Sequence, residues 1–183
     1  MRATDGPHRV LQLTTPQEKG RDHEREVIAL CLDRLFIGER QVVRSPTRSG
    51  LGLRSDRERM LRSLRENLPE LKESTVSGFR RANREQHGIT PDFDPKSCLV
   101  PVDDRRFRHL FRDDEGWDRF REAFPDSDGT LRISRVGFDQ SCTQALLYTG
   151  QQFDWTVGLS GFWLFERSLG GWELAGRAGT DVS

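Results

Sequence analysis

Apolar residues in the first half of the chain recur at the three- and four-residue spacing of amphipathic helices. One such stripe lies between Asp22 and Gly38, residue types suited to begin and to end a helix. A second stripe follows Ser55 and Glu58, a capping-box pair, and stops before Pro69. The apolar positions of these two predicted helices are Val27, Ile28, Cys31, Leu32 and Leu35 in the first, and Met60, Leu61, Leu64 and Leu68 in the second.

Three shorter helices are predicted downstream. The first opens at Thr75 and closes near Gly88, a residue suited to the position after a helix. The second covers residues 105–111. The third carries Trp117, Phe120 and Phe124 on its apolar side. The chain therefore alternates short helices with short connections up to about residue 125.

Two short apolar runs among these helices predict strands. The first is formed by residues 41–43, and Pro46 ends it. The second is formed by residues 98–102 and contains Pro101. Because proline cannot donate a hydrogen bond to a neighbouring strand, this second run is expected at a sheet edge or at a bulge.

The last third of the chain predicts a β-meander. Apolar runs over 130–138, 143–148 and 161–166 are separated by polar or glycine-containing breaks, a pattern typical of consecutive antiparallel strands. Along the first run the apolar positions change parity, and a strand can do so only where an extra residue is inserted. A bulge near Ser134 and Arg135 is therefore predicted.

The order of these elements predicts an α+β fold, with N-terminal helices packed on a C-terminal antiparallel β-meander that spans residues 130–176. A length of 183 residues suits one hydrophobic core. We expect residues 22–183 to form this single domain. Residues 1–21 show no sustained period and are expected to be a disordered arm.

The charge balance argues against partners that are recruited by long-range electrostatics. The chain holds 29 basic and 29 acidic residues, so no net field steers it toward nucleic acid or an anionic membrane. No apolar segment approaches the length of a membrane span, and the first twenty residues do not resemble a signal peptide. A cytoplasmic protein without a membrane partner is expected.

Five segments of the C-terminal region together resemble a known pattern. They are residues 134–139 (SRVGFD), 143–148 (TQALLY), 164–167 (LFER), Trp172 and the closing 182–183 (VS). They resemble a group of uncharacterised bacterial proteins that carry the pattern SRVGFN…TQALVYVG…YYLLEK…GKW…WVS. The similarity covers roughly residues 24–183. It implies a common fold, and it supplies no catalytic residues, because no activity is established for the group.

The chain departs from this group after residue 150. Many members place a glycine-rich, often cysteine-containing segment here, whereas this chain has Phe153, Asp154 and Trp155 in a predicted connection between strands. Aromatic rings in a connection either fold back onto the core or stay exposed as anchors for a partner. The hypothesis for ligand or partner binding is a recognition patch of Phe153 and Trp155, with Asp154 giving polar specificity.

A cysteine-dependent hydrolase is the alternative. It would combine the thiol of Cys142 with the imidazole of His109 and a carboxylate from Asp113 or Asp114. Cys142 falls in a predicted turn and not at a helix N-terminus that would lower its pKa. The acidic run from Asp113 to Asp118 could also hold a cation, but acidic residues are typical of a helix start. No metal site is predicted.

Basic residues form two runs, 80–84 and 105–112, interleaved with phenylalanines at helical spacing. Such runs are typical of a solvated helix face opposite a core stripe, so nucleic-acid binding is disfavoured. The sequence also lacks a phosphate-binding glycine loop and a nucleophile elbow. We therefore expect a non-enzymatic accessory or binding domain that recognises a small ligand or a protein partner, without a cofactor.

Overall fold

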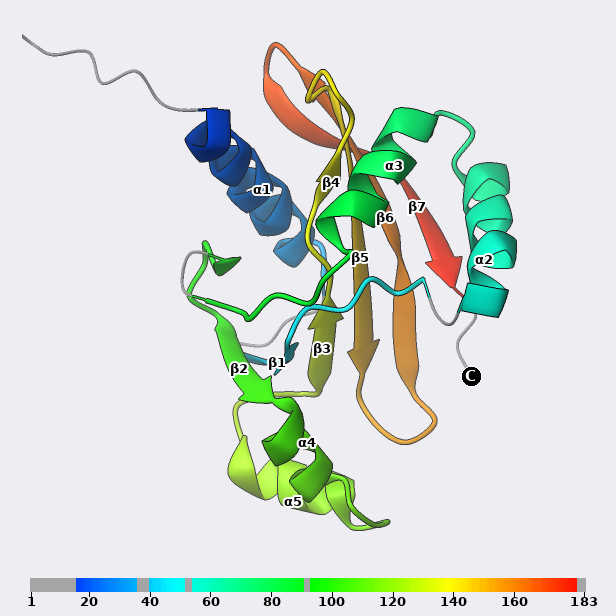
Figure 1. Ribbon diagram of the computed structural model, residues 1–183. Coiled ribbons are helices and arrows are strands. Elements are labelled where there is room, and N and C mark those ends of the chain that lie inside the picture. Colours follow the sequence, from blue (N-terminus) through cyan, green and yellow to red (C-terminus); the bar gives the residue numbers. More distant parts are fainter. Residues whose placement is uncertain (1–15, 36–39, 52–53, 91–92, 181–183) are drawn as a thin grey trace, which may run out of the picture.

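The computed structural model describes residues 16–35, 40–51, 54–90 and 93–180. The helices of these residues are α1 (Pro16–Leu32), α2 (Arg54–Asn67), α3 (Glu73–Ala82), α4 (Asp104–Leu110) and α5 (Gly116–Ala123). The strands are β1 (Gln41–Ser45), β2 (Leu99–Asp103), β3 (Thr130–Ile133), β4 (Gly137–Phe138), β5 (Gln144–Gln152), β6 (Gly158–Ser168) and β7 (Gly171–Thr180). They form one sheet, and the α+β class is confirmed (Figure 1).

The sheet is mixed, which corrects the prediction of a purely antiparallel meander. From β3 to β7 the pairings are antiparallel as expected, but β1 joins this part in parallel to β3 and carries β2 on its other side, also in parallel. Val42 and Val43 of β1 are both buried, so this strand needs cover on both faces and neighbours on both sides. The strand order is β2-β1-β3-β5-β6-β7, with β4 paired to β5.

Helices cover both faces of the sheet, where the sequence predicted only that they pack on it. The core against α1 contains Val27, Ile28 and Cys31 together with Leu147 of β5. The opposite face packs α2 and α3 against the other parity of the same strands, including Leu146. On that second face, α4 and α5 close the end that lies away from the β4–β5 turn (Figure 1).

The first helix begins earlier than predicted. It starts at Pro16, six residues before Asp22, so residues 16–21 are helical and the expected disordered arm 1–21 is wrong in its boundary. Proline is well suited to the first helical position, because the N–H it lacks would have no partner there. Residues 1–15 and the predicted helix end at Gly38 lie outside the described residues.

The contact between α3 and β4 is unusually close. A Cβ atom added at Gly137 would lie 2.1 Å from the Cα of Phe79, and one added at Gly78 would lie 1.9 Å from the carbonyl oxygen of Phe138. Asn83 closes the same contact, since its side chain donates to the Arg135 carbonyl and accepts from the Arg135 N–H, both at 2.9 Å. Glycine is required at this crossing because backbone packs on backbone.

The predicted bulge at Ser134 and Arg135 is confirmed by the strand register. Ile133 pairs with Thr149 and Gly137 pairs with Leu146, so four steps along this strand match three steps along β5. The extra residue reverses which alternate positions face the core. Apolar side chains are therefore buried both before and after the bulge.

Candidate functional site

The structure does not assemble the cysteine hydrolase that the sequence allowed. Cys142 lies in the β4–β5 turn and His109 lies on α4, and Figure 1 shows these two segments at opposite ends of the molecule. β5 alone separates the ends of the sheet by about 30 Å. Asp113 is engaged by the guanidinium groups of Arg119 and Arg112. A cysteine hydrolase needs its thiol and its imidazole within hydrogen-bond reach. The predicted combination of Cys142 and His109 with Asp113 or Asp114 is therefore wrong.

The three residues of the predicted recognition patch lie in the turn between β5 and β6. Phe153 is half-buried, and its N–H donates to the Val157 carbonyl at 2.9 Å. The Asp154 carboxylate accepts from the Trp155 N–H at 2.7 Å and pairs with Arg121 of α5 at 3.5 Å. This aspartate therefore serves the turn and its contact with α5.

Trp155 is the exposed member of the three. Its ring lies 5.8 Å from the Phe111 ring, edge to face, and its indole N–H donates to the Asp114 carbonyl at 3.3 Å. These two contacts fix the ring on the α4–α5 end of the molecule, while 47% of the residue stays exposed. Val157 and Leu159, at 54% and 48% exposure, extend the apolar surface beside it.

Three adjoining hollows form a groove beside Trp155. The central hollow, of about 510 Å³, is lined by Arg44, Arg48, Arg84, Arg132 and Tyr148, among others. It shares Arg132 and Tyr148 with a tryptophan hollow of about 210 Å³ that Trp155 lines, and it shares Arg84 with a helix hollow of about 510 Å³ beside α3. We call these three hollows together the arginine groove.

The sheet supplies the floor of the groove. Val43 pairs with Leu131 in the parallel β1–β3 ladder, so Arg44 and Arg132, one residue on, are neighbours on one face. Tyr148 and Gly150 of β5 lie on this face too. α2 and α3 cover the half nearer the β4–β5 turn, and the groove occupies the part between them and α4 (Figure 1).

Two of the groove arginines are held in place by α4. The Asp104 carboxylate accepts from Arg44 Nε at 2.8 Å and from Arg48 Nη2 at 2.6 Å, and the Arg44 guanidinium lies 4.6 Å from the centre of the Phe107 ring. Burial alone would raise the pKa of Asp104, but the hydrogen bonds and charges of the two arginines outweigh it and hold this pKa below its ordinary value. The carboxylate balances only one of the two cations.

The other groove arginines carry charge without a matching carboxylate. Arg80, Arg81 and Arg84 form no ion pair among the residues that the structure describes, and all three are exposed. Arg132 donates to the Gln152 side-chain oxygen at 3.3 Å, a neutral acceptor. Glu85 is the acidic residue on the lining of the central hollow. The groove thus carries an excess of positive charge although the whole chain is neutral.

Sequence reasoning missed Arg44, Arg48, Arg132 and Tyr148 as a group. They come from three separate segments, and no local pattern marks any of them. The run from Arg80 to Arg84 predicts a solvated helix face. That interpretation agrees with the exposure of these arginines, but it did not include the groove that they border.

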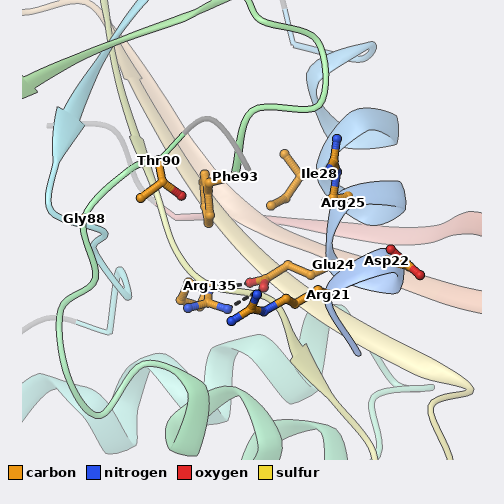
Figure 2. Close-up of a pocket in the computed structure, with 9 residues that line it drawn as sticks. All are labelled: Arg21, Asp22, Glu24, Arg25, Ile28, Gly88, Thr90, Phe93 and Arg135. Carbon is orange, nitrogen blue, oxygen red and sulfur yellow. Dashed lines mark hydrogen bonds and ion pairs between the residues drawn. The ribbon is translucent and has the colours of Figure 1, made fainter. Parts of the chain in front are cut away.

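A second cavity, of about 450 Å³, lies between α1 and the segment after α3 (Figure 2). Its centre is an ion pair in which Arg135 Nε donates to the Glu24 carboxylate at 2.6 Å, and the Val136 N–H donates to the same carboxylate at 3.1 Å. Hydrogen bonding to Glu24 raises the pKa of Arg135. Because these partners satisfy one another, we interpret the pair as the tether of α1 to the bulge.

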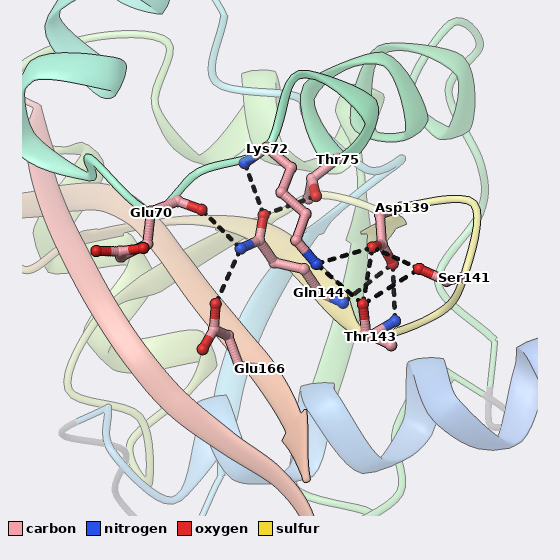
Figure 3. A network of polar contacts seen from close by, with 8 residues as sticks. All are labelled: Glu70, Lys72, Thr75, Asp139, Ser141, Thr143, Gln144 and Glu166. Atoms are coloured by element: carbon pink, nitrogen blue, oxygen red, sulfur yellow. Dashed lines mark hydrogen bonds and ion pairs between the residues drawn. The ribbon is translucent and has the colours of Figure 1, made fainter.

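A cluster of polar side chains surrounds Asp139 in the β4–β5 turn (Figure 3). Its carboxylate is 3% exposed and accepts from the Thr143 N–H at 2.7 Å, the Gln144 N–H at 3.0 Å, and the hydroxyls of Ser141 and Thr143 at 3.0 and 2.9 Å. Lys72 pairs with it at 3.2 Å. Burial would raise the pKa of Asp139, but these donors lower it to about 2.

Gln144 connects this turn to α3 and to β6. Its side-chain oxygen accepts from the Lys72 N–H at 2.9 Å and the Thr75 hydroxyl at 2.7 Å. Its side-chain nitrogen donates to the Glu70 carbonyl at 2.9 Å and to Glu166 at 3.1 Å. Because the Asp139 carboxylate and the Gln144 side-chain amide are engaged in this way, the cluster fixes the β4–β5 turn and is a structural feature.

The Asp139 cluster predicts a specific pH dependence of stability. The native state favours the ionised carboxylate, so its contribution is complete above the ordinary pKa of 3.8 and is lost as the pH falls toward about 2. We expect Asp139→Asn to lower the free energy of unfolding by about 2 kcal/mol at pH 7 and by much less at pH 2. Urea unfolding of both proteins at the two pH values measures this; a gap independent of pH would contradict it.

Among the described residues, no group of histidine, cysteine and carboxylate side chains is arranged to hold a metal ion. Burial raises the pKa of the Cys31 thiol to about 12, so this thiol is unreactive at neutral pH. No helix in the described part of the chain is long and apolar enough to cross a membrane.

Comparison of the chain with protein-family models, with curated proteins and with solved structures finds no match.

Proposed function

We propose that this protein is a non-enzymatic binding domain that recognises a small anionic ligand in the arginine groove. The observation that supports this function is the convergence of Arg44, Arg48, Arg84 and Arg132 on one hollow in which carboxylates are in the minority. Guanidinium groups bind carboxylates and phosphates through paired hydrogen bonds, and such charged bonds are about twice as strong as neutral ones.

Contacts within the protein hold the groove arginines in place. Asp104 and the Phe107 ring hold Arg44, and the β-ladder fixes the backbone beneath Arg132. An arginine that is already positioned loses less side-chain entropy on binding than a freely moving one. The anionic surface of a protein partner would meet the same arginines, so the test below includes an acidic peptide.

The recognition patch of the sequence analysis enters this proposal in reduced form. Asp154 is paired with Arg121 and Phe153 is half-buried, so neither is offered to a ligand in the way that the hypothesis required. Trp155 lines the tryptophan hollow and is the part of the patch that we retain for ligand binding.

Membership in the bacterial group with the SRVGFN…TQALVYVG pattern is proposed on the sequence alone. The residues that carry it, such as Gly137 and Gln144, have structural roles here: Gly137 permits the contact of β4 with α3, and Gln144 connects α3 to the sheet. These roles support a shared fold. The groove arginines 44, 48, 84 and 132 are not among the residues of the pattern.

Titration calorimetry with tripolyphosphate at low ionic strength tests the proposed function. We expect binding by the intact protein and a loss of at least tenfold in affinity in the double variant Arg84→Gln, Arg132→Gln, because each charged hydrogen bond contributes about 1.5–3 kcal/mol. Arg167→Gln is the matched control: this exposed arginine, at the far end of β6, pairs in register with Trp172.

Two results would contradict the proposed function. One is an intact protein that does not bind tripolyphosphate. The other is an equal loss of affinity in the double variant and in Arg167→Gln, which would indicate unspecific charge attraction. An aspartate-rich peptide is titrated in parallel, and tighter binding of the peptide than of tripolyphosphate would move the proposal from a small ligand to a protein partner.

A further inference from the structure

We propose that the arginine groove takes a nucleoside polyphosphate, with the base on Trp155 in the tryptophan hollow and the phosphate groups on the arginines of the central hollow. This inference rests on the proposed function and specifies its ligand. It combines three features of the groove: an aromatic end, a cationic centre and a floor that joins them.

The central hollow and the tryptophan hollow adjoin. Arg132 and Tyr148 line both the central hollow and the tryptophan hollow, so the two spaces meet at these side chains. A ligand whose ring lies in the tryptophan hollow therefore places its next groups beside the Arg132 guanidinium. Further along the same groove follow Arg44, Arg48 and then Arg84.

The tryptophan hollow suits a planar group. Its floor includes Gly150 and Gly158, which have no side chains, and a Cβ added at Gly150 would lie 3.0 Å from the Tyr148 hydroxyl. Trp155 is fixed by the Phe111 ring and the Asp114 carbonyl, yet about half of it is exposed. A held and exposed indole is a stacking surface for a nucleobase.

The central hollow suits adjacent phosphate groups. Among the described residues, Arg84 and Arg132 form no ion pair, and the Arg44–Arg48–Asp104 set adds one net positive charge. Glu85 is an acidic residue on the lining of this hollow, so the four arginines keep an excess of positive charge there. A di- or triphosphate carries several negative charges within a few ångströms, and guanidinium groups on three chain segments can contact it from different sides.

A longer nucleic-acid strand would use the same chemistry, but the molecule favours the mononucleotide. Strand binding depends on basic charge distributed along an extended surface, and this chain has a net charge of +0. The arginine groove has Trp155 at one end, and the exposed apolar residues Val157 and Leu159 line the hollow there, where a strand would need further basic side chains.

The experiment compares ATP and GTP with tripolyphosphate by calorimetry in the full-length protein. We expect at least one nucleotide to bind about tenfold more tightly than tripolyphosphate, the increment that base stacking supplies. Trp155→Ala should abolish that difference, and Trp155→Phe should keep most of it. Leu169→Ala is the control, because Leu169 is exposed at the β6–β7 turn and does not line the groove. Circular dichroism confirms that each variant is folded.

The outcomes separate this inference from the proposed function. Equal binding of nucleotides and tripolyphosphate, unchanged in Trp155→Ala, would overturn the inference and leave the anion site intact. No binding of any of the three would overturn both. A ten-residue single-stranded oligonucleotide that binds more than tenfold more tightly than the mononucleotides would also overturn it, in favour of a nucleic-acid ligand. A nucleotide preference that depends on Trp155 supports it.

Discussion

Gly137→Ala is expected to destabilise the protein by about 3 kcal/mol, the upper end of the cost of overpacking. The new methyl group would lie 2.1 Å from the Phe79 Cα and 2.3 Å from the Phe79 nitrogen, and both atoms belong to the backbone of α3. No side-chain rotation relieves this overlap, so the helix must move away from β4. That movement loosens the Phe79 ring, which is fully buried against Phe162.

Urea unfolding followed by far-UV circular dichroism measures this effect. The matched control is Gly20→Ala, because Gly20 lies inside α1 and an added Cβ meets nothing within 4 Å. There the same substitution should stabilise the protein by about 0.5–1 kcal/mol through the higher helix propensity of alanine. A loss below about 1 kcal/mol in Gly137→Ala would show that the contact of α3 with β4 is looser than described.

Trp172→Ala is the second large effect, with an expected cost of about 3–5 kcal/mol. The indole is 6% exposed on β7, and its ring centre lies 5.5 Å from that of Phe138 and 5.9 Å from that of His23. Its N–H donates to His23 Nδ1 at 3.4 Å. One side chain thus joins β7, β4 and α1, and truncation leaves a cavity among all three.

Thermal and urea unfolding of Trp172→Ala and of the milder Trp172→Phe test this role. Trp172→Phe should lose clearly less stability than Trp172→Ala, because a ring still fills most of the space. If Trp172→Ala costs less than about 1 kcal/mol, the ring does not serve as a core contact and the β6–β7 register that buries it is in error.

Local patterns in the sequence predicted the parts of the fold that depend on local physics. The stripe from Val27 to Leu35 is buried as expected, since helical periodicity alone decides which side faces the core. Pro101 lies in the edge strand β2, because its missing N–H excludes it from the interior of a sheet. Leu164, in the apolar run 161–166 that predicts a strand, is buried in the sheet.

Long-range pairing was not predictable in the same way. β1 is a short strand whose parallel partners, β2 and β3, lie more than fifty residues away, so no turn residue specifies either pairing. The start of α1 at Pro16 was not predicted, because the apolar stripe of this helix begins only at Val27, eleven residues later.

The candidate site depends on the same long-range pairing. Arg44 and Arg132 become neighbours only because β1 lies beside β3, and Arg84 joins them because α3 packs against β4. Trp155 was selected from the sequence as an aromatic residue in a connection, and it lines one end of the groove. A single residue type can be noticed in a sequence, whereas the set that surrounds a ligand is a property of the fold.

The central claim, that the arginine groove binds an anionic ligand, is tested most directly by nuclear magnetic resonance of the arginine side chains. The Nε–Hε signals are followed while tripolyphosphate is added to the intact protein. We predict that the largest shifts occur at Arg84 and Arg132, with smaller ones at Arg44. Shifts confined to Arg21 and Arg25 of the cavity beside α1, or no shifts at any of these arginines, would contradict the claim.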